Sequence, residues 1–362
     1  MVALLGARQV GKSTLARQLE PDHFYDLENS RHVARLDDPL SELEQLRGLV
    51  VLDEVQRRPE IFPALRVLAD RRPLPARFLV LGSATPALLR QSSESLAGRI
   101  EVHQLEGLAL DEVGEKALDR LWTRGGFPPS FLSRSERDSF TWRRSYLRTV
   151  VERDLPQLGT TVPAATLDRF WQMLAHVHGG VLNWSELGRS MGVTDMTVRH
   201  YLDILSQAFL VRVLKPWHEN IGKRQVKAPK VYLRDSGVLH ALLDLTDLRA
   251  LTGHPRAGAS WEGFCVEQVV DLLGAEAHQC YFWATHQGAE LDLLIARGTK
   301  RTGFEFKLTS APALTPSMRT AVADLRLDEL VVVHRGPDAF QMAPKVRALP
   351  ASRLTEIKGR SA

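Results

Sequence analysis

The feature that most constrains the fold of this chain is a glycine-rich octapeptide near its first residue. Residues 6–13 read GARQVGKS, which fits the pattern GxxxxGK[ST] letter for letter. An apolar run over 2–5 precedes the octapeptide, and an amphipathic helix is predicted over 13–20. A strand that runs through such a loop into a helix is typical of a parallel α/β sheet. The octapeptide therefore predicts a phosphate-binding loop at the edge of such a sheet.

In a loop of this kind the glycines allow backbone N–H groups to point at phosphate oxygens from the start of a helix. We expect Lys12 to reach the β- and γ-phosphates of ATP and the Ser13 hydroxyl to ligate Mg²⁺. The alternative is a glycine turn that binds nothing. The residues predicted to bind ATP are Gly6, Ala7, Arg8, Gln9, Val10, Gly11, Lys12, Ser13 and Thr14.

Two further apolar runs end in polar residues that belong with such a loop. The run over 49–52 is followed by Asp53, which we expect to hold the Mg²⁺ shell, and by Glu54, which we expect to polarise the attacking water. The run over 78–81 leads to Ser83, whose hydroxyl is placed to sense the γ-phosphate. Because these carboxylates accompany the loop, the sequence predicts hydrolysis of ATP rather than binding alone.

Length and composition limit the class of protein. At about 150 residues per domain, the 362 residues indicate two or three domains. Hydrophobic residues make up 44% and charged residues 25%, which excludes disordered, collagen-like and coiled-coil chains. Two cysteines, Cys265 and Cys280, provide neither a disulfide framework nor a zinc pattern. With no apolar run of membrane-spanning length and no signal peptide, we expect a cytoplasmic protein without a membrane partner.

The start of the chain carries one further expectation. The strand predicted over 2–5 has no residues before it that could form a flanking element. A buried strand is normally covered on both faces. We therefore expect that an N-terminal segment is missing from this sequence.

The middle of the chain reads as a winged helix. Residues 184–206 predict two helices around a glycine-containing turn, and the runs over 209–214 and 230–233 predict the two strands of a wing. Positive charge gathers between residues 215 and 230, although the net charge of the chain is only +4. The pattern indicates either DNA contact or a module that packs against or docks a partner. The candidate DNA contacts are Thr197, Arg199, His200, Lys223, Arg224 and Lys227.

The last third of the chain carries acids and a lysine on elements that could meet. Glu262 lies in a predicted helix over 261–273, Asp292 in a strand over 290–294, and Glu305 and Lys307 on one face of a strand over 304–307. If the two strands form a hairpin, Asp292 lies beside Glu305 and Lys307. Such a group can hold Mg²⁺ or Mn²⁺ and activate water for phosphodiester cleavage. The alternative is ion pairing or partner binding without cleavage.

Several strings together resemble a prokaryotic AAA+ family related to the STAND and archaeal-type ATPases, and the resemblance covers essentially the whole chain. They are GARQVGKSTL, VVLDEVQ, LGSATPALL, SLAGRIEVHQLEGL, GGFPPSF and YLRTVVERDL. The resemblance implies that Arg99 is an arginine finger acting on the nucleotide of a neighbouring subunit in a homo-oligomer, the alternative being a surface or structural arginine. It also implies that Gly126 and Pro128 belong to a lid motif near the base and phosphates. Residues 152–154, ERD, match a family string with no derived role.

The C-terminal order of a helix glutamate, a strand aspartate and an E-x-K strand resembles the PD-(D/E)xK nuclease fold. The expected fold class is therefore α/β with four parts. They are a P-loop parallel sheet of AAA+ type over 1–108, a helical lid over 109–160, a winged helix over 161–257 and a nuclease-like domain over 258–362.

Two functions are expected, both with ATP and Mg²⁺ as cofactors. The first is a Mg²⁺-dependent ATPase whose nucleotide state controls a C-terminal half that acts on DNA, with a second Mg²⁺ or Mn²⁺ at Glu262, Asp292 and Glu305. The second is a STAND-like regulatory switch that binds ATP and recruits a protein partner. In the second function the nuclease-like fold is catalytically inactive.

Overall fold

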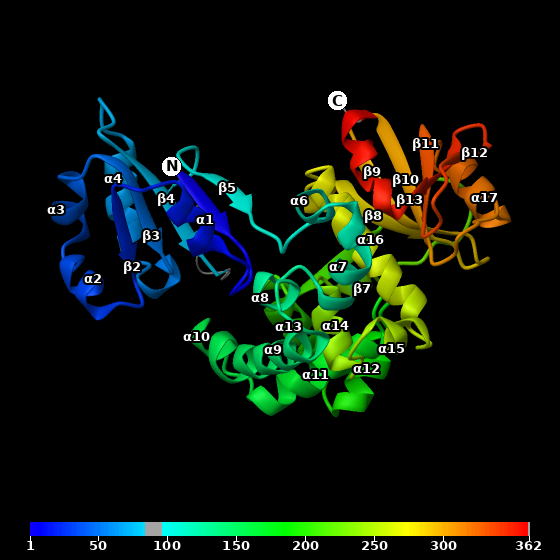
Figure 1. Ribbon diagram of the computed structural model, residues 1–362, viewed down its shortest axis with the longest axis horizontal. Helices are drawn as coiled ribbons and strands as arrows, with labels where there is room; N and C mark the ends of the chain where they lie inside the picture. Colours follow the sequence, from blue (N-terminus) through cyan, green and yellow to red (C-terminus); the bar gives the residue numbers. More distant parts are fainter. Residues whose placement is uncertain (84–95, 361–362) are drawn as a thin grey trace. The chain divides into compact units, whose positions relative to one another are not determined.

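The computed structural model describes residues 1–83 and 96–360 (Figure 1). The chain divides into two compact units. The first comprises Met1–Gly107, Glu152–Thr161 and Gln207–Phe209, and the second comprises Leu108–Val151, Val162–Ser206 and Leu210–Ala362. Each unit therefore contains residues from several stretches of the sequence.

The first unit is built on a five-stranded parallel sheet with the strand order β2-β3-β4-β1-β5. The strand bounds are β1 Val2–Leu5, β2 His23–Asp26, β3 Gly48–Asp53, β4 Ala76–Gly82 and β5 Glu101–Gln104. Strands β3 and β4 are apolar and almost wholly buried, as strands covered on both faces must be. The predicted parallel α/β sheet in the N-terminal part of the chain is confirmed.

Short helices connect these strands. Their bounds are α1 Lys12–Gln18, α2 Ser30–Arg35, α3 Pro39–Glu44, α4 Ile61–Ala69 and, from the later segment, α10 Leu155–Gln157. Helix α4 buries Ile61, Phe62, Leu65 and Leu68, a spacing that places them on one helix face. They join the apolar side chains of β3 and β4 in the main core of this unit.

The second unit contains most of the helices of the chain. Their bounds are α6 Leu110–Val113, α7 Leu118–Arg124, α8 Pro128–Phe131, α9 Glu136–Thr149, α11 Ala164–His176, α12 Trp184–Met191, α13 Asp195–Gln207, α14 Ser236–Leu242, α15 Leu248–Thr252, α16 Ala257–Leu272 and α17 Pro316–Asp324. A π-helical turn, Val150–Asp154, follows α9. The chain ends in 3-10 turns over Ala351–Arg360.

The helices predicted as a separate lid are part of this second unit. The Trp122 ring, on α7, meets the Trp261 ring, on α16, edge to face, with 5.1 Å between ring centroids. The Trp122 indole N–H donates to the Ser260 hydroxyl over 3.0 Å. These buried contacts join segments that are distant in sequence. The assignment of residues 109–160 as a helical lid stays a prediction.

An eight-stranded sheet runs through the second unit in the order β12-β13-β11-β10-β9-β8-β6-β7. The strand bounds are β6 Val211–Pro216, β7 Lys230–Leu233, β8 Cys280–Ala284, β9 Glu290–Arg297, β10 Lys300–Lys307, β11 Glu329–His334, β12 Phe340–Ala343 and β13 Val346–Pro350. The two strands predicted as a wing, β6 and β7, form an antiparallel pair, and β6 also pairs in parallel with β8. Strands β6 and β7 therefore belong to the same sheet as the strands that follow residue 257, and the boundary expected there stays a prediction.

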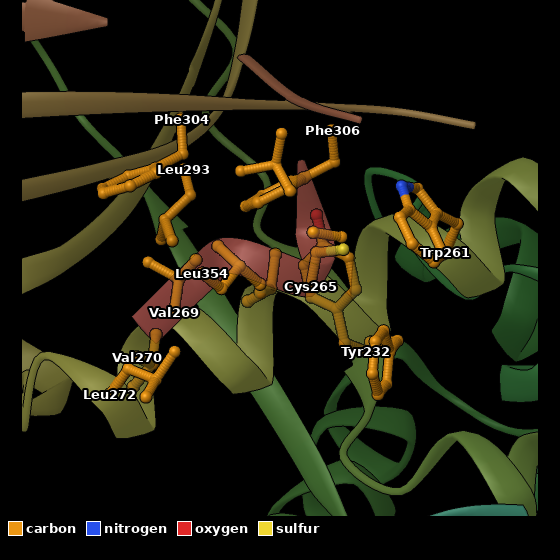
Figure 2. Close-up of a cluster of buried hydrophobic side chains, with 14 of the residues drawn as sticks. Tyr232, Trp261, Cys265, Val269, Val270, Leu272, Leu293, Phe304, Phe306 and Leu354 are labelled. Carbon is orange, nitrogen blue, oxygen red and sulfur yellow. The ribbon is translucent and has the colours of Figure 1, made fainter. Parts of the chain in front are cut away.

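One hydrophobic core of the second unit lies between α16 and the sheet (Figure 2). Side chains of α16, including Cys265 and Val269, meet Leu293 of β9 and Phe304 and Phe306 of β10. Cys265 and Cys280 are both buried free thiols. Within residues 1–83 and 96–360, no helix is both long enough and apolar enough to cross a membrane.

Candidate nucleotide site and acidic cluster

The phosphate-binding loop connects β1 to α1, as predicted. Gln9 and Gly11 have positive φ angles of 64° and 109°, and glycine at Gly11 takes such an angle without strain. No side chain caps the first turn of α1, so its backbone N–H groups are open to an anion. A Cβ at Gly6 would lie 2.3 Å from the carbonyl oxygen of Leu105, so only glycine fits there.

Lys12 is folded into this loop. Its Nζ atom donates to the carbonyl oxygens of Gly6, over 2.9 Å, and Ala7, over 2.8 Å. Burial lowers the pKa of Lys12 to about 8, although Glu54 and Asp53 oppose the shift. The lysine is thus held beside the backbone that would cradle phosphate oxygens, and these N–H and ammonium groups fit a nucleotide phosphate chain.

Asp53 stands at the end of β3, as the sequence predicted, and its side chain is buried. Burial raises the pKa of the Asp53 carboxyl, while a hydrogen bond with the Ser13 side chain lowers it. The structure therefore brings together the hydroxyl and the carboxylate that were predicted from separate motifs. A hard oxygen pair of this kind fits Mg²⁺.

Glu54 follows in the left-handed conformation, with φ 57° and ψ 42°. Such an angle is uncommon for a residue other than glycine, and it marks a functional or strained position. The Ser83 hydroxyl donates to Glu54 Oε2 over 3.4 Å, and the Gln56 amide donates to the same oxygen. The predicted water-activating and γ-phosphate-sensing residues are therefore neighbours.

Arg8 has a role in the structure that the loop pattern did not reveal. The sequence placed only its backbone at the phosphates, but its guanidinium is paired with Asp154 and lies 3.4 Å from Glu28 Oε1. Asp154 belongs to the ERD string for which no role was derived. The sequence features that could have indicated this pairing are the arginine inside the loop, Arg8, and the acid of the ERD string, Asp154.

Arg99 is engaged by a carboxylate of its own unit. Its Nε and Nη2 atoms donate to the two oxygens of Asp70 over 2.6 and 2.9 Å. Such a bidentate ion pair is expected if Arg99 is a structural arginine, which is the alternative to an arginine finger. Action of Arg99 as a finger on a neighbouring subunit stays a prediction.

Gly126 and Pro128 belong to the second unit. The Gly126 N–H donates to Asp235 Oδ2 over 2.7 Å, and Pro128 opens α8, where a proline is favoured. Asp235 also caps α14. These contacts give the glycine-proline break a structural role within the second unit, and contact with nucleotide stays a prediction.

The four residues predicted as a nuclease-like group lie close together. Strands β9 and β10 form the expected hairpin, with Phe304 opposite Leu293. Lys307 Nζ lies 2.6 Å from Glu305 Oε2 and 4.0 Å from Asp292 Oδ2. The charge of Asp292 also acts on Glu262, which faces it from α16.

A second lysine, Lys230, belongs to the stretch of positive charge between residues 215 and 230 and lies inside this acidic cluster. Lys230 Nζ is 2.9 Å from Glu262 Oε1, 2.5 Å from Glu290 Oε1 and 3.8 Å from Asp292 Oδ1. The Tyr232 hydroxyl donates to Glu262 Oε1 over 2.6 Å. Alternation along β7 places Lys230 and Tyr232 on one face, and this was the signal that could have found them.

The titration of the acidic cluster reflects its burial. Burial, reinforced by the charge of Asp292, raises the pKa of Glu262 to about 7 and that of Glu305 to about 8. Burial alone would lower the pKa of Lys230, but Tyr232 and the surrounding carboxylates raise it well above its usual value. The ammonium of Lys230 is therefore a permanent part of the cluster at neutral pH.

The described residues form no ligand set for the second metal that was predicted here. Within the described ranges 1–83 and 96–360, no three His, Cys, Asp or Glu side chains are grouped so that they could hold a metal ion. The physical reason is charge compensation, because Lys230 and Lys307 supply the positive charge that a divalent ion would bring.

The candidate DNA contacts fall into two groups. Arg199 and His200 are exposed on α13, and the Arg199 guanidinium lies over the Trp184 ring, 4.0 Å from its centroid. Thr197 shares a hydrogen bond with Thr194 over 3.0 Å. On the β6–β7 connection, Arg224 and Lys227 are exposed, whereas Lys223 is paired with Asp324 over 2.6 Å.

Models of three known families match consecutive stretches of the chain. The model described as "AAA domain" matches residues 1–114. A domain of unknown function (DUF8612) matches residues 115–249, and a domain of unknown function (DUF4143) matches residues 257–354. The parallel sheet, the loop with Lys12 and the following carboxylates thus define a P-loop protein with an N-terminal AAA domain.

Two mycobacterial relatives identify the family. The uncharacterized protein Rv2008c of Mycobacterium tuberculosis and the uncharacterized protein Mb2031c of Mycobacterium bovis are each 50% identical over 357 residues, covering 98% of this chain and 80% of the relative. The chain belongs to the same protein family as these two. The crystal structure of protein VC1899 from Vibrio cholerae aligns with 99% of this chain and 96% of its own at 11% identity, with a TM-score of 0.20, which is too low to bear on the fold.

Proposed function

We propose that this protein is a Mg²⁺-dependent ATPase of AAA type whose nucleotide state controls the C-terminal half of the chain. The observation that carries the proposal is the hydrogen-bonded pair of Ser13 and Asp53 beside the buried ammonium of Lys12. A single site can bind the phosphates, hold the metal and position the water only if these three groups converge there.

The residues divide the chemistry between them. Ser13 and Asp53 would hold Mg²⁺, which when bound neutralises charge on the β- and γ-phosphates. Lys12 exchanges its bonds to loop carbonyls for bonds to phosphate oxygens. Glu54, fixed by Ser83 and Gln56, orients and polarises the attacking water.

The ATP site is tested by replacing Lys12. Lys12→Ala is expected to weaken ATP binding by at least about tenfold, because the charge-assisted bonds to the phosphates are lost. Arg17→Ala is the matched control, since it removes one positive charge from the exposed face of the same helix. Equilibrium binding of ATP with Mg²⁺ to both variants measures the difference. Equal affinities would contradict the site.

Two candidates exist for the C-terminal half: metal-dependent cleavage of DNA, and a switch that binds a partner without cleaving. We infer the second from the acidic cluster, where Lys230 and Lys307 already pair with Glu262, Asp292 and Glu305. Buried carboxylates with such partners need no metal. The exposed side chains of Arg199, Arg224 and Lys227 support DNA as one such partner, and a protein is the other.

The two candidates are separated by a cleavage assay with Mn²⁺ and Mg²⁺, with and without ATP, on double- and single-stranded DNA and on RNA. The inferred switch predicts that every substrate stays intact. Cleavage by the wild type that Asp292→Ala abolishes would establish the nuclease instead. Cleavage that Asp292→Ala leaves unchanged would point to a contaminating nuclease.

A further inference from the structure

The string Glu152-Arg153-Asp154 contacts the phosphate-binding loop through the side chain of Asp154. Residues Glu152–Thr161 belong to the first unit, whereas the residues on either side of them belong to the second. Asp154 is buried, and its carboxylate accepts a hydrogen bond from Nη1 of Arg8. Arg8 lies inside the octapeptide that forms the loop. An isolated segment of the first unit is therefore attached directly to its predicted phosphate site.

The pair formed by Arg8 and Asp154 leaves two polar atoms unused. Among the described residues, Arg8 Nε and Asp154 Oδ2 are buried and have no hydrogen-bond partner. A buried polar atom without a partner costs free energy, so an unsatisfied group in a folded protein calls for an explanation. A guanidinium with a spare donor is suited to a further oxygen ligand, and phosphate is the oxygen ligand that this loop predicts.

The electrostatic effects also place the pair close to the other residues of the site. Burial is the main cause that lowers the pKa of Lys12, and the charge of Arg8 lowers it further. Burial is likewise the main cause that raises the pKa of Asp154, and the charge of Glu54 raises it further. Arg8 therefore lies near Lys12, and Asp154 lies near Glu54, the residues predicted to reach the phosphates and to polarise water. The pair is thus beside the predicted phosphate site.

A second acid, Glu28, forms ion pairs with the arginines around this pair. Glu28 Oε1 lies 2.6 Å from Arg57, 3.4 Å from Arg8 and 3.7 Å from Arg153. Arg57 also donates to Gln157 over 3.4 Å. These contacts are partly exposed, whereas the pair of Arg8 and Asp154 and the apolar side chain of Leu155 are buried. Arg8 therefore supplies the buried polar part of the attachment.

We propose that Asp154 and the γ-phosphate of ATP compete for the guanidinium of Arg8, so that ATP, but not ADP, loosens the segment Glu152–Thr161 from the first unit. The inference rests on the proposed ATP site. The segment continues a π-helical turn, Val150–Asp154, which follows α9, and it leads into α11. Both helices belong to the second unit. The covalent chain therefore carries the nucleotide state from the loop to the second unit.

Competition gives Asp154 a signature that a structural acid lacks. Removing the competitor with Asp154→Asn is expected to raise the affinity for a triphosphate on the order of tenfold and to leave the affinity for ADP unchanged. Removing the shared group with Arg8→Gln is expected to lower triphosphate affinity only. In the double variant, Asp154→Asn is expected to have no further effect, because the group for which it competes is gone.

The experiment measures equilibrium binding of AMP-PNP and of ADP, each with Mg²⁺, to the full chain. Glu42→Gln is the control, since it removes one acid from the ion pair with Arg35 in the same unit, and it should change neither affinity. Equal affinities of wild type and Asp154→Asn for AMP-PNP, or an equal gain for AMP-PNP and ADP, would overturn the competition. If the wild type binds neither nucleotide, the proposed ATP site fails, and the competition fails with it.

A second measurement needs no variant and so does not depend on whether Asp154→Asn folds. Hydrogen exchange of backbone amides over Glu152–Thr161 is expected to be faster in wild type with AMP-PNP than with ADP, at concentrations that saturate both. The helix α4 serves as the internal reference in the same unit. Equal exchange of the segment in the two nucleotides would overturn the proposal.

Discussion

Lys230 is the residue on which the balance of charge in the second unit depends. Its side chain is 4% exposed and lies among Glu262, Glu290 and Asp292. Lys230→Met keeps most of the volume but leaves buried carboxylates without a cation, which is expected to lower the free energy of unfolding by about 3–5 kcal/mol. Urea denaturation followed by circular dichroism measures the loss.

Lys223→Met is the matched control for that variant. Its ammonium also pairs with one acid, Asp324, but the side chain is 33% exposed. The free energy of unfolding is expected to change by less than about 1 kcal/mol. Similar losses for the two variants would show that Lys230 does not hold the acidic cluster together.

The same cluster predicts a pH dependence. The pKa values of Glu262 and Glu305 are raised to about 7 and about 8, so the folded state binds protons that the unfolded state has released. Stability from these groups is complete below their unfolded pKa, near 4.5, and is lost as the pH rises through 7 and 8. The free energy of unfolding is therefore expected to fall between pH 6.5 and 8.

His178 and His240 oppose this effect only in the lower part of the range. Burial lowers the pKa of both to about 3, so the stability that they contribute still rises as the pH passes their unfolded pKa near 6.5 and is nearly complete above about pH 7.5, where they add no slope. Glu305→Gln should flatten the fall, because it removes one titrating group. Denaturation at several pH values measures the slope, and a slope equal to that of the wild type would contradict the role of Glu305.

Single residues were predictable where their chemistry is local in sequence. Lys12, Ser13, Asp53 and Glu54 follow from two short strings, because the loop and the strand end impose those residue types. Asp154 and Lys230 were not predictable in their roles, since each meets its partner across a long stretch of chain. Sequence shows a charged residue but not the opposite charge that burial places beside it.

At the scale of elements, Asp235 joins the glycine break to α14. It caps α14 by accepting from the Val238 N–H over 2.8 Å, and it accepts from the Gly126 N–H over 2.7 Å. A Cβ at Gly125, which has φ 76°, would lie 2.1 Å from the Asp235 carboxylate. The break therefore requires glycine because it wraps closely around this cap.

Asp235→Ala is expected to cost about 2–4 kcal/mol in the free energy of unfolding. The loss of a helix cap contributes roughly 1 kcal/mol, and the unpaired Gly126 N–H contributes about 1–3 kcal/mol more. Asp247→Ala, which removes the cap of α15 and an exposed hydrogen bond from the neighbouring Thr246 hydroxyl, is the control. Thermal denaturation of both measures the difference, and equal losses would argue against the link to Gly126.

Strands and helices were easier to predict than their partners. The runs that became β6 and β7 were correctly read as paired strands, but the pattern did not show which further strand they would join. Strand β8 pairs with β6 only through Lys215 and Pro216, opposite Tyr281 and Phe282. Pairing over so few residues leaves no trace in the alternation of side chains. The sequence therefore predicts a wing and does not show that the hairpin continues into a larger sheet.

At the scale of the whole molecule, the two units are built from separate stretches of sequence, although the motifs follow one another along the chain. The parallel sheet and loop of the first unit follow from residues 1–107, but the unit also takes in Glu152–Thr161 and Gln207–Phe209. Boundaries placed along the sequence cannot show that a later segment returns to an earlier unit, because the contacts involved are non-local. The chain therefore passes between the two units at the ends of these returning segments as well as after Gly107.

The central claim is that the first unit hydrolyses ATP, and the turnover of Glu54→Gln tests it most directly. ATP hydrolysis with Mg²⁺ should be measured for wild type and this variant at nucleotide concentrations that saturate both. The variant should bind ATP as tightly as the wild type and show a fall in turnover of at least about a hundredfold, because its amide cannot polarise water as the carboxylate does. Turnover equal to that of the wild type, or a wild type without ATP hydrolysis, would contradict the claim.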